Sequence, residues 1–170
     1  MANTEKDLLV FLEYYADKSS VLDGSNKRNP TKLWQNFYQV AQLLSGVDSD
    51  GPTSEFFYLA FDANGFGNVE AGGVSDLSIN LAATAEIVDL TDTAIGGDRL
   101  VIASLYIQNT GFDSIQSNAQ LISRYTGTID SVSLTDQTAS WSVSPAISKQ
   151  KAQVPSRRIV SDLLGRFEGR

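Results

Sequence analysis

The spacing of apolar residues changes near residue 50, and this change constrains the fold more than any other feature of the sequence. Up to residue 47 the apolar residues recur at intervals of three and four, the spacing of one helix face. From residue 54 to residue 145 they alternate or form short runs, as strands do. The sequence therefore predicts an α+β fold. The two helical stripes are Leu8, Phe11, Leu12 and Tyr15, and Leu33, Trp34, Phe37, Tyr38, Ala41 and Leu44.

Residues 1–47 are predicted to form a helical hairpin. Thr4 followed by Asp7 resembles a capping box, with Asp in place of the usual Glu or Gln. Asn29 is a good N-cap residue, and Pro30 stands at the first position of the second helix. Two amphipathic helices with a short connection make a hairpin. Its aromatic rings are expected to form core against a sheet, with a partner-binding aromatic face as the alternative.

Residues 54–145 are predicted to form an antiparallel β-barrel or sandwich. Leu77, Ile79 and Leu81 alternate with polar residues, and Leu100–Ile107 is almost entirely apolar, like a strand buried on both faces. Strands separated by polar loops favour a barrel or a sandwich. Strands do not alternate with helices in this pattern, which argues against a doubly wound parallel fold.

The last two predicted strands form a hairpin. Thr128–Leu134 and Ala139–Val143 are joined by Thr135–Thr138, whose polar residues suit a turn. Side chains two residues apart lie on the same face of a strand. Trp141 is therefore expected to face the interior, together with the apolar residues two before and two after it.

Charge separates the body of the chain from its end. The whole sequence carries 13 Lys and Arg against 20 Asp and Glu, a net −7. Residues 48–136 hold 13 acids against Arg99 and Arg124, a net −11, whereas residues 137–170 hold six cations against two acids, a net +4. One interpretation is a polarised solvated surface, and the other is head-to-tail docking of the basic end on a neighbour's acidic body. Nucleic acid is a poor partner for so acidic a body.

The basic end, residues 146–170, is predicted to be a C-terminal arm that binds a partner. It carries an apolar stripe at helical spacing on an otherwise polar segment, and so short a helix does not stay folded alone in water. The stripe must therefore dock, either on its own barrel or on a neighbouring subunit. The predicted partner-binding residues are Arg157, Arg158, Leu163, Leu164 and Phe167.

The sequence contains no cysteine and no histidine, which excludes disulfides, thiolate nucleophiles, Ser–His–Asp triads, His-based zinc sites and haem ligation by either residue. Asp62–Gly67 resembles the start of a calcium loop, but Phe66 and Gly73 occupy the fifth and twelfth positions, where oxygen ligands are needed. No apolar run reaches the roughly 18 residues of a membrane span, and the N-terminus lacks a signal-peptide pattern. We therefore expect no enzyme activity, catalytic residue, metal, cofactor or membrane contact. A pair of carboxylates suited to glycoside hydrolysis is the remaining catalytic alternative.

Two late strands and the segment after them resemble a known family. Tyr125–Val132 contains the pattern Gly-x-Ile-x-x-Val, Ala139–Pro145 follows a tight turn, and Val154–Arg158 contains Val-Pro-x-Arg. In this order they are similar to the C-terminal half of the small β-barrel proteins that build the tail tip of long-tailed bacteriophages. The resemblance covers residues 77–158 and leaves the predicted helical hairpin outside it.

The resemblance implies a structural role between the distal tail ring and the central hub, where those proteins sit. The implied partners are other virion tail proteins, including ring and hub, and copies of the same chain. The implied location is the virion tail, after synthesis in the host cytoplasm. Some relatives hold a metal cluster with C-terminal cysteines, which this chain lacks. The alternatives are a head–tail connector or neck protein, and a carbohydrate-binding β-module in which Trp34, Trp141 or tyrosines stack on sugars.

Overall fold

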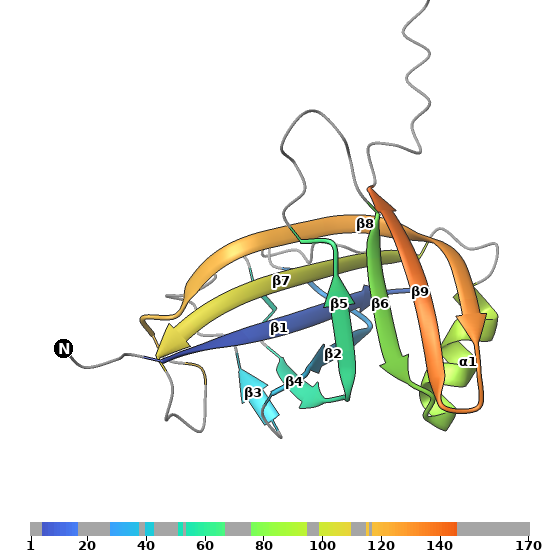
Figure 1. The fold of residues 1–170 in the computed structure, drawn as a ribbon, viewed down its shortest axis with the longest axis horizontal. Helices are drawn as coiled ribbons and strands as arrows, with labels where there is room; N and C mark the ends of the chain where they lie inside the picture. Colours follow the sequence, from blue (N-terminus) through green and yellow to red (C-terminus); the bar gives the residue numbers. More distant parts are fainter. Residues whose placement is uncertain are drawn as a thin grey trace, which may run out of the picture.

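The computed structural model describes residues 5–16, 28–37, 40–42, 51, 52, 54–66, 76–94, 99–109, 115 and 117–145. These residues form nine strands and one helix (Figure 1). In chain order they are β1 (Lys6–Tyr15), β2 (Lys32–Gln35), β3 (Val40–Gln42), β4 (Glu55–Tyr58), β5 (Phe61–Asn64), β6 (Leu77–Ala82), α1 (Ala85–Ala94), β7 (Leu100–Asn109), β8 (Gln120–Leu134) and β9 (Thr138–Pro145).

All nine strands belong to one sheet, in the order β3-β4-β2-β1-β7-β8-β9-β6-β5. Neighbouring strands are antiparallel except β2 and β4, which run parallel, so the sheet is mixed. β1 pairs with β7 along its whole length, from Lys6 opposite Asn109 to Tyr15 opposite Leu100. Within the described residues, β3 and β5 are the two edges of this sheet.

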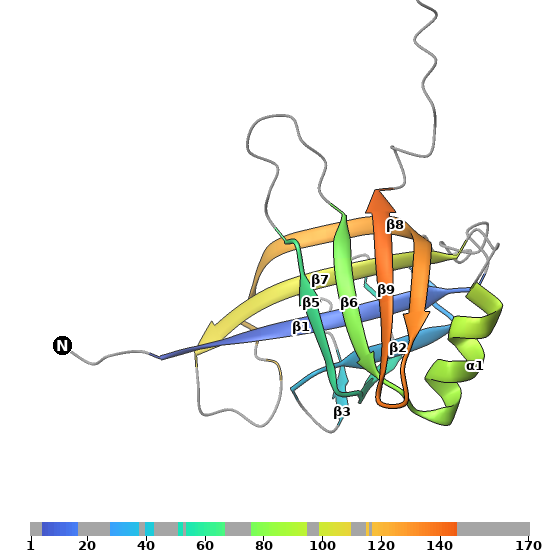
Figure 2. The ribbon, with the colours of Figure 1, turned by 45° about the vertical axis from the view of Figure 1, so that its right-hand side comes forward.

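The sheet folds over on itself, so that β5, β6 and β9 cross the strands β1 and β7 (Figures 1 and 2). β8, which is 15 residues long, curves around and belongs to both layers. Its pairing with β9 shifts between Ile129 and Ser131, and such a bulge bends a strand. The main core fills the space between the layers. Its members include Val10, Leu12, Tyr14 and Trp34 from one layer and Leu77, Ile79, Leu81, Trp141 and Val143 from the other.

Helix α1 packs beside the hairpin end of β8 and β9 (Figure 2). Thr84 caps its N-terminus, because the Thr84 Oγ1 accepts a hydrogen bond from the Ile87 N–H at 3.3 Å. Ile87 itself is fully buried in the main core. The sequence pattern predicts strands alone in this part of the chain, so α1 is a departure from it.

The helical hairpin predicted over residues 1–47 is wrong, because the described residues of this part form β1, β2 and β3. Only Glu13 is polar between residues 8 and 15, so the helical stripe is one subset of a continuous apolar run. A continuous run suits a strand that is covered on both faces. The side chains on one face of β1 include Leu9 and Phe11, and those on the other include Val10, Leu12 and Tyr14.

The predicted fold class changes accordingly. One short helix accompanies nine strands in the described residues, so the protein is mostly β rather than α+β. A single folded-over mixed sheet replaces the predicted antiparallel barrel or sandwich. Its two central strands β1 and β7 come from the two segments that the apolar spacing separates.

The predictions for the last strands are confirmed. β7 covers the apolar run Leu100–Ile107, and β8 and β9 form a hairpin. Its turn is closed by the Thr135 N–H, which donates to the Thr138 carbonyl oxygen at 2.8 Å. Trp141 and the apolar residues two positions away on either side, Ala139 and Val143, are fully buried.

Gly127 lies where β9 passes close to β8. A Cβ atom there would overlap the Ser144 carbonyl oxygen and stand 2.8 Å from the Val143 Cγ1. The backbone of β9 cannot move away from Gly127 without losing hydrogen bonds to β8. Gly127→Ala is therefore expected to destabilise the protein by about 1–3 kcal/mol. Urea unfolding measures this, with Thr126→Ala at the neighbouring exposed position as the control. Equal stability of the two variants would contradict the packing described here.

Candidate partner-binding site

The predicted partner-binding residues Arg157, Arg158, Leu163, Leu164 and Phe167 lie outside the described residues. The described residues instead show the surfaces on which an arm or another partner can dock. Two features stand out among the described residues: three exposed aromatic side chains in and near β4, and a pocket that one of them lines.

The predicted sugar-stacking tryptophans are both core residues. Trp141 is fully buried, and its Nε1–H donates to the Thr91 Oγ1 at 3.0 Å. Trp34 is 5% exposed. Trp141 therefore cannot stack on a sugar ring, and Trp34 offers only the part of its surface that lines the pocket.

Three aromatic side chains near β4 are about half exposed: Phe37 at 48%, Phe57 at 58% and Tyr58 at 54%. Phe56, by contrast, is fully buried and packs edge-on against Phe11, with ring centroids 4.9 Å apart. Successive side chains of a strand point to opposite faces, so β4 buries Phe56 on one face and presents Phe57 on the other. By the same rule Phe57 and Tyr58 point to opposite faces of β4, and of the three exposed rings only Phe57 lines the pocket.

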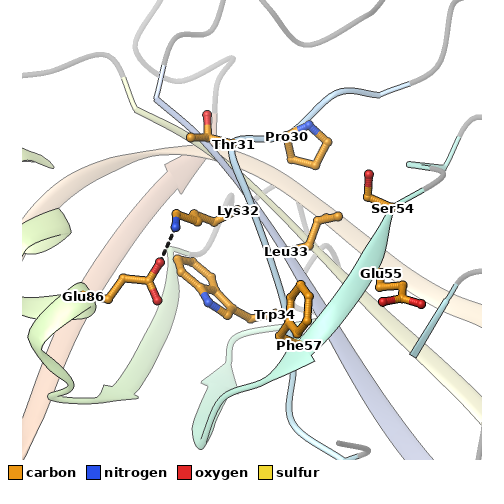
Figure 3. A pocket seen from close by; sticks show the side chains of 9 residues that line it. All are labelled: Pro30, Thr31, Lys32, Leu33, Trp34, Ser54, Glu55, Phe57 and Glu86. Carbon is orange, nitrogen blue, oxygen red and sulfur yellow. Dashed lines mark ion pairs between the residues drawn. The ribbon is translucent and has the colours of Figure 1, made fainter. Parts of the chain in front are cut away.

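A pocket of about 460 Å³ lies between β2, β4 and α1 (Figure 3). Ligand-binding pockets have volumes of roughly 300–1,000 Å³. The rings of Trp34 and Phe57 lie next to each other in it, and Lys32 and Glu86 stand on one side of them. The lining residues are Pro30, Thr31, Lys32, Leu33, Trp34, Ser54, Glu55, Phe57 and Glu86.

Of the two aromatic rings in the pocket, that of Trp34 is buried and held in place, whereas that of Phe57 is exposed. The parallel pairing of β2 with β4 places Trp34 opposite Phe57. Behind the pocket, the Trp34 ring centroid lies 6.2 Å from that of Tyr14 and 6.4 Å from that of Trp141. Packing against two buried rings holds Trp34 in one orientation, while Phe57 keeps most of its surface in solvent.

The borders of the pocket are acidic. Glu86 of α1 forms an ion pair with Lys32 of β2, and Glu55 lies on the opposite side (Figure 3). Asp89 and Asp92 follow Glu86 along the exposed side of α1, a helix without Lys or Arg. The Lys32–Glu86 pair is nearly half exposed, and pairs of this kind contribute about 0–1 kcal/mol. A competing cation can therefore replace Lys32 at little cost.

The outer face of β5, β6, β9 and the end of β8 is covered by small polar side chains. Ser140 Oγ donates to the Asn80 Oδ1 at 2.7 Å. Short side chains have few rotamers to lose, so contact with a flat partner costs little conformational entropy. The two cross-strand rows are Asp62, Asn80, Ser140 and Ser133, and Asn64, Ser78, Ser142 and Ser131.

A buried polar cluster lies on the face of β1 opposite the main core. Arg28 donates to Glu13 from Nε at 2.8 Å and from Nη2 at 3.0 Å, and the Tyr15 hydroxyl donates to the same carboxylate at 2.7 Å. Burial raises the pKa of Tyr15 far above its usual value, and the Glu13 charge adds to this rise. Because Glu13 and Arg28 are both buried, the cluster is closed to a partner in solution.

The described residues contain no group of three Asp, Glu, His or Cys side chains that could hold a metal ion. In the same part of the chain, no helix is both long and apolar enough to cross a bilayer. The arrangement near β4 offers apolar contact and acidic side chains to a partner.

Of the pocket residues, the sequence analysis names only Trp34 as a binding candidate, as a platform for sugars, and it does not predict the pocket. A usable signal is present in Glu55–Tyr58, where three adjacent aromatic residues must occupy both faces of one strand. The pattern cannot show that Lys32 and Glu86, 54 positions apart, meet across the same cavity.

Comparison with known proteins adds no relative. No protein-family model matches the sequence, and no curated protein is similar to it. Function is therefore inferred from the surface near β4 and from the sequence resemblance of the last strands.

Proposed function

We propose that the chain is a structural component of a bacteriophage virion, in the tail tip or baseplate, and that it acts by self-assembly and contact with neighbouring tail proteins. The observation that carries the proposal is the exposed ring of Phe57 in a pocket with acidic borders, with Phe37 and Tyr58 also half exposed in and near β4. Covering these rings removes apolar area from water, which favours association. The Gly-x-Ile-x-x-Val pattern of β8 supports the tail tip as the kind of assembly.

The mechanism would be geometric. β1, β7 and β8 are long paired strands that brace the folded-over sheet and make it a stiff wall (Figure 1). The small polar side chains on its outer face suit contact with a flat neighbour. Partner contact at the pocket would then fix the position of each copy relative to the next.

A carbohydrate-binding β-module is the second candidate, and one observation favours it. Phe57 presents an exposed ring between Glu55 and Glu86, and sugar sites combine an aromatic surface with polar groups. A head–tail connector is the alternative within the structural class, and it differs from a tail-tip protein by its place in the virion.

The proposal predicts that the chain is a fixed constituent of purified phage particles. Quantitative mass spectrometry of particles washed at high salt should find the full chain at the same copy number per particle in every preparation. A glycan array with the purified chain is the control for the sugar-binding candidate. Particles without the chain, together with specific glycan binding, would reject the structural role.

A further inference from the structure

The pocket between β2, β4 and α1 has the chemistry of a receptor for the basic C-terminal arm. We propose that it receives the arm of a neighbouring copy of this chain. The proposal rests on the assembly role proposed above, and it names the contact through which copies join. It concerns the apolar stripe Leu163, Leu164 and Phe167 and the arginines around it.

The apolar parts of pocket and arm match each other. The pocket offers the Trp34 edge and the exposed ring of Phe57, and its volume of about 460 Å³ suits a few apolar side chains rather than a whole domain. The arm offers an apolar stripe that a short helix cannot keep in water. Docking would remove both surfaces from solvent, which is the main favourable contribution to association.

The charges of pocket and arm are also complementary. Glu55 and Glu86 flank the rings, and Asp89 and Asp92 extend the acidic border along α1. Residues 156–170 carry four arginines against two acids. The guanidinium fork of Arg binds a carboxylate through two hydrogen bonds, a geometry that the Lys32 ammonium does not provide. An incoming arginine can therefore replace Lys32 at Glu86.

The course of β9 favours the pocket of a neighbour over the pocket of the same copy. β9 begins beside α1, where the Ala83 N–H donates to the Gln137 carbonyl oxygen at 3.0 Å. It then runs away from α1 and ends at Pro145, roughly 23 Å further on at 3.3 Å per residue. β9 therefore ends on the side of the molecule away from α1, the helix that carries Glu86 of the pocket (Figure 2). Residues 146–160 can span about 50 Å when extended, so the arm is long enough for either pocket, and only the direction of β9 favours the neighbour.

Such a contact joins two different surfaces of identical chains. Contacts of this kind generate a ring when the rotation between copies closes, and an open filament when it does not. Two copies that exchange arms would instead close into a two-fold dimer, and the number of chains in the disulfide-linked species distinguishes that dimer from a ring.

The absence of cysteine from the chain allows a test by disulfide trapping. Two full-length variants are mixed under oxidising conditions: Ser54→Cys at the exposed pocket rim and Ser161→Cys in the arm. The control pairs the same arm variant with Ser133→Cys, which is exposed on the other layer. Docking raises the local thiol concentration, so the mixed disulfide should form on the order of tenfold faster with the pocket variant than with the control.

Two further variants identify the chemistry of the contact. Phe167→Asp in the arm variant should reduce the rate to that of the control, and Phe167→Leu should preserve it. Added salt should slow the reaction, because it screens the arginine–carboxylate attraction. Equal rates for the pocket and control pairs would overturn the proposal. A rate of disulfide formation that Phe167→Asp leaves unchanged would also overturn it.

A chain that carries both Ser54→Cys and Ser161→Cys separates the two possible sources of the arm. Docking on a neighbour predicts disulfide-linked oligomers whose share rises with protein concentration. Closure within single chains at every concentration would overturn the proposal. The proposed function is tested independently, because loss of the chain from purified particles would reject it whatever the disulfide result.

Discussion

Trp141→Ala is expected to lower the free energy of unfolding by about 3–5 kcal/mol, the range for a buried aromatic ring replaced by alanine. The Trp141 side chain is fully buried between the two layers of the sheet, with its ring centroid 5.8 Å from that of Tyr14. Its Nε1–H also donates to Thr91 of α1, so it links the helix to the sheet. Chemical unfolding followed by circular dichroism measures the loss.

Trp141→Phe is the matched control for this prediction. It keeps an aromatic ring in the core but removes the hydrogen bond to Thr91, so it should cost about 1–2 kcal/mol. Trp141→Phe should therefore destabilise the protein less than Trp141→Ala does. A loss below about 1 kcal/mol for Trp141→Ala would mean that the ring is not part of the core and would restore Trp141 as a sugar platform.

Glu13→Ala is expected to cost about 3–5 kcal/mol, because it leaves the Arg28 charge buried without its carboxylate. Glu13 is 1% exposed and Arg28 8% exposed, so water cannot easily replace the lost partner. The Tyr15 hydroxyl loses its acceptor at the same time. The measurement is again the free energy of unfolding at neutral pH.

The double variant Glu13→Gln with Arg28→Met tests the cause of this loss. Replacing both charges removes the uncompensated one, so the double variant should be more stable than Glu13→Ala. If the double variant is no more stable than Glu13→Ala, the cost comes from packing and not from the buried charge.

The confirmed predictions come from segments in which pattern and burial agree. Leu100–Ile107 is apolar on both sides because β7 lies between β1 and β8 and is covered on both faces. In β9 the alternation around Trp141 reflects one buried and one polar face. A period of two residues fixes which side chains point inward, and no long-range information is needed for that inference.

The prediction of a helical hairpin over residues 1–47 is wrong for a physical reason. A run in which almost every residue is apolar contains the helical spacing and the strand spacing at once, so periodicity alone cannot decide between them. β1 is a strand because β7 and β2 pair with it on either side, and these partners lie elsewhere in the chain. Pro30, a good first residue of a helix, instead precedes the short strand β2.

The binding surface was predictable only in part. The distribution of charge along the sequence shows a basic arm and an acidic body, and it suggests docking between copies. The pocket itself depends on the parallel pairing of β2 with β4 and on α1, a helix that the sequence pattern does not indicate. Local spacing contains neither fact, because each requires residues far apart in the chain to meet.

An electron cryomicroscopy reconstruction of purified particles would show whether the chain is built into a phage tail as an assembly part. We expect a closed ring of copies at the tail tip, each a folded-over nine-stranded sheet joined to the next copy through the pocket beside β4. Density for the chain at the neck would reject the tail tip in favour of a connector. Complete, infectious particles with no density for the chain at any place would contradict the assembly role itself.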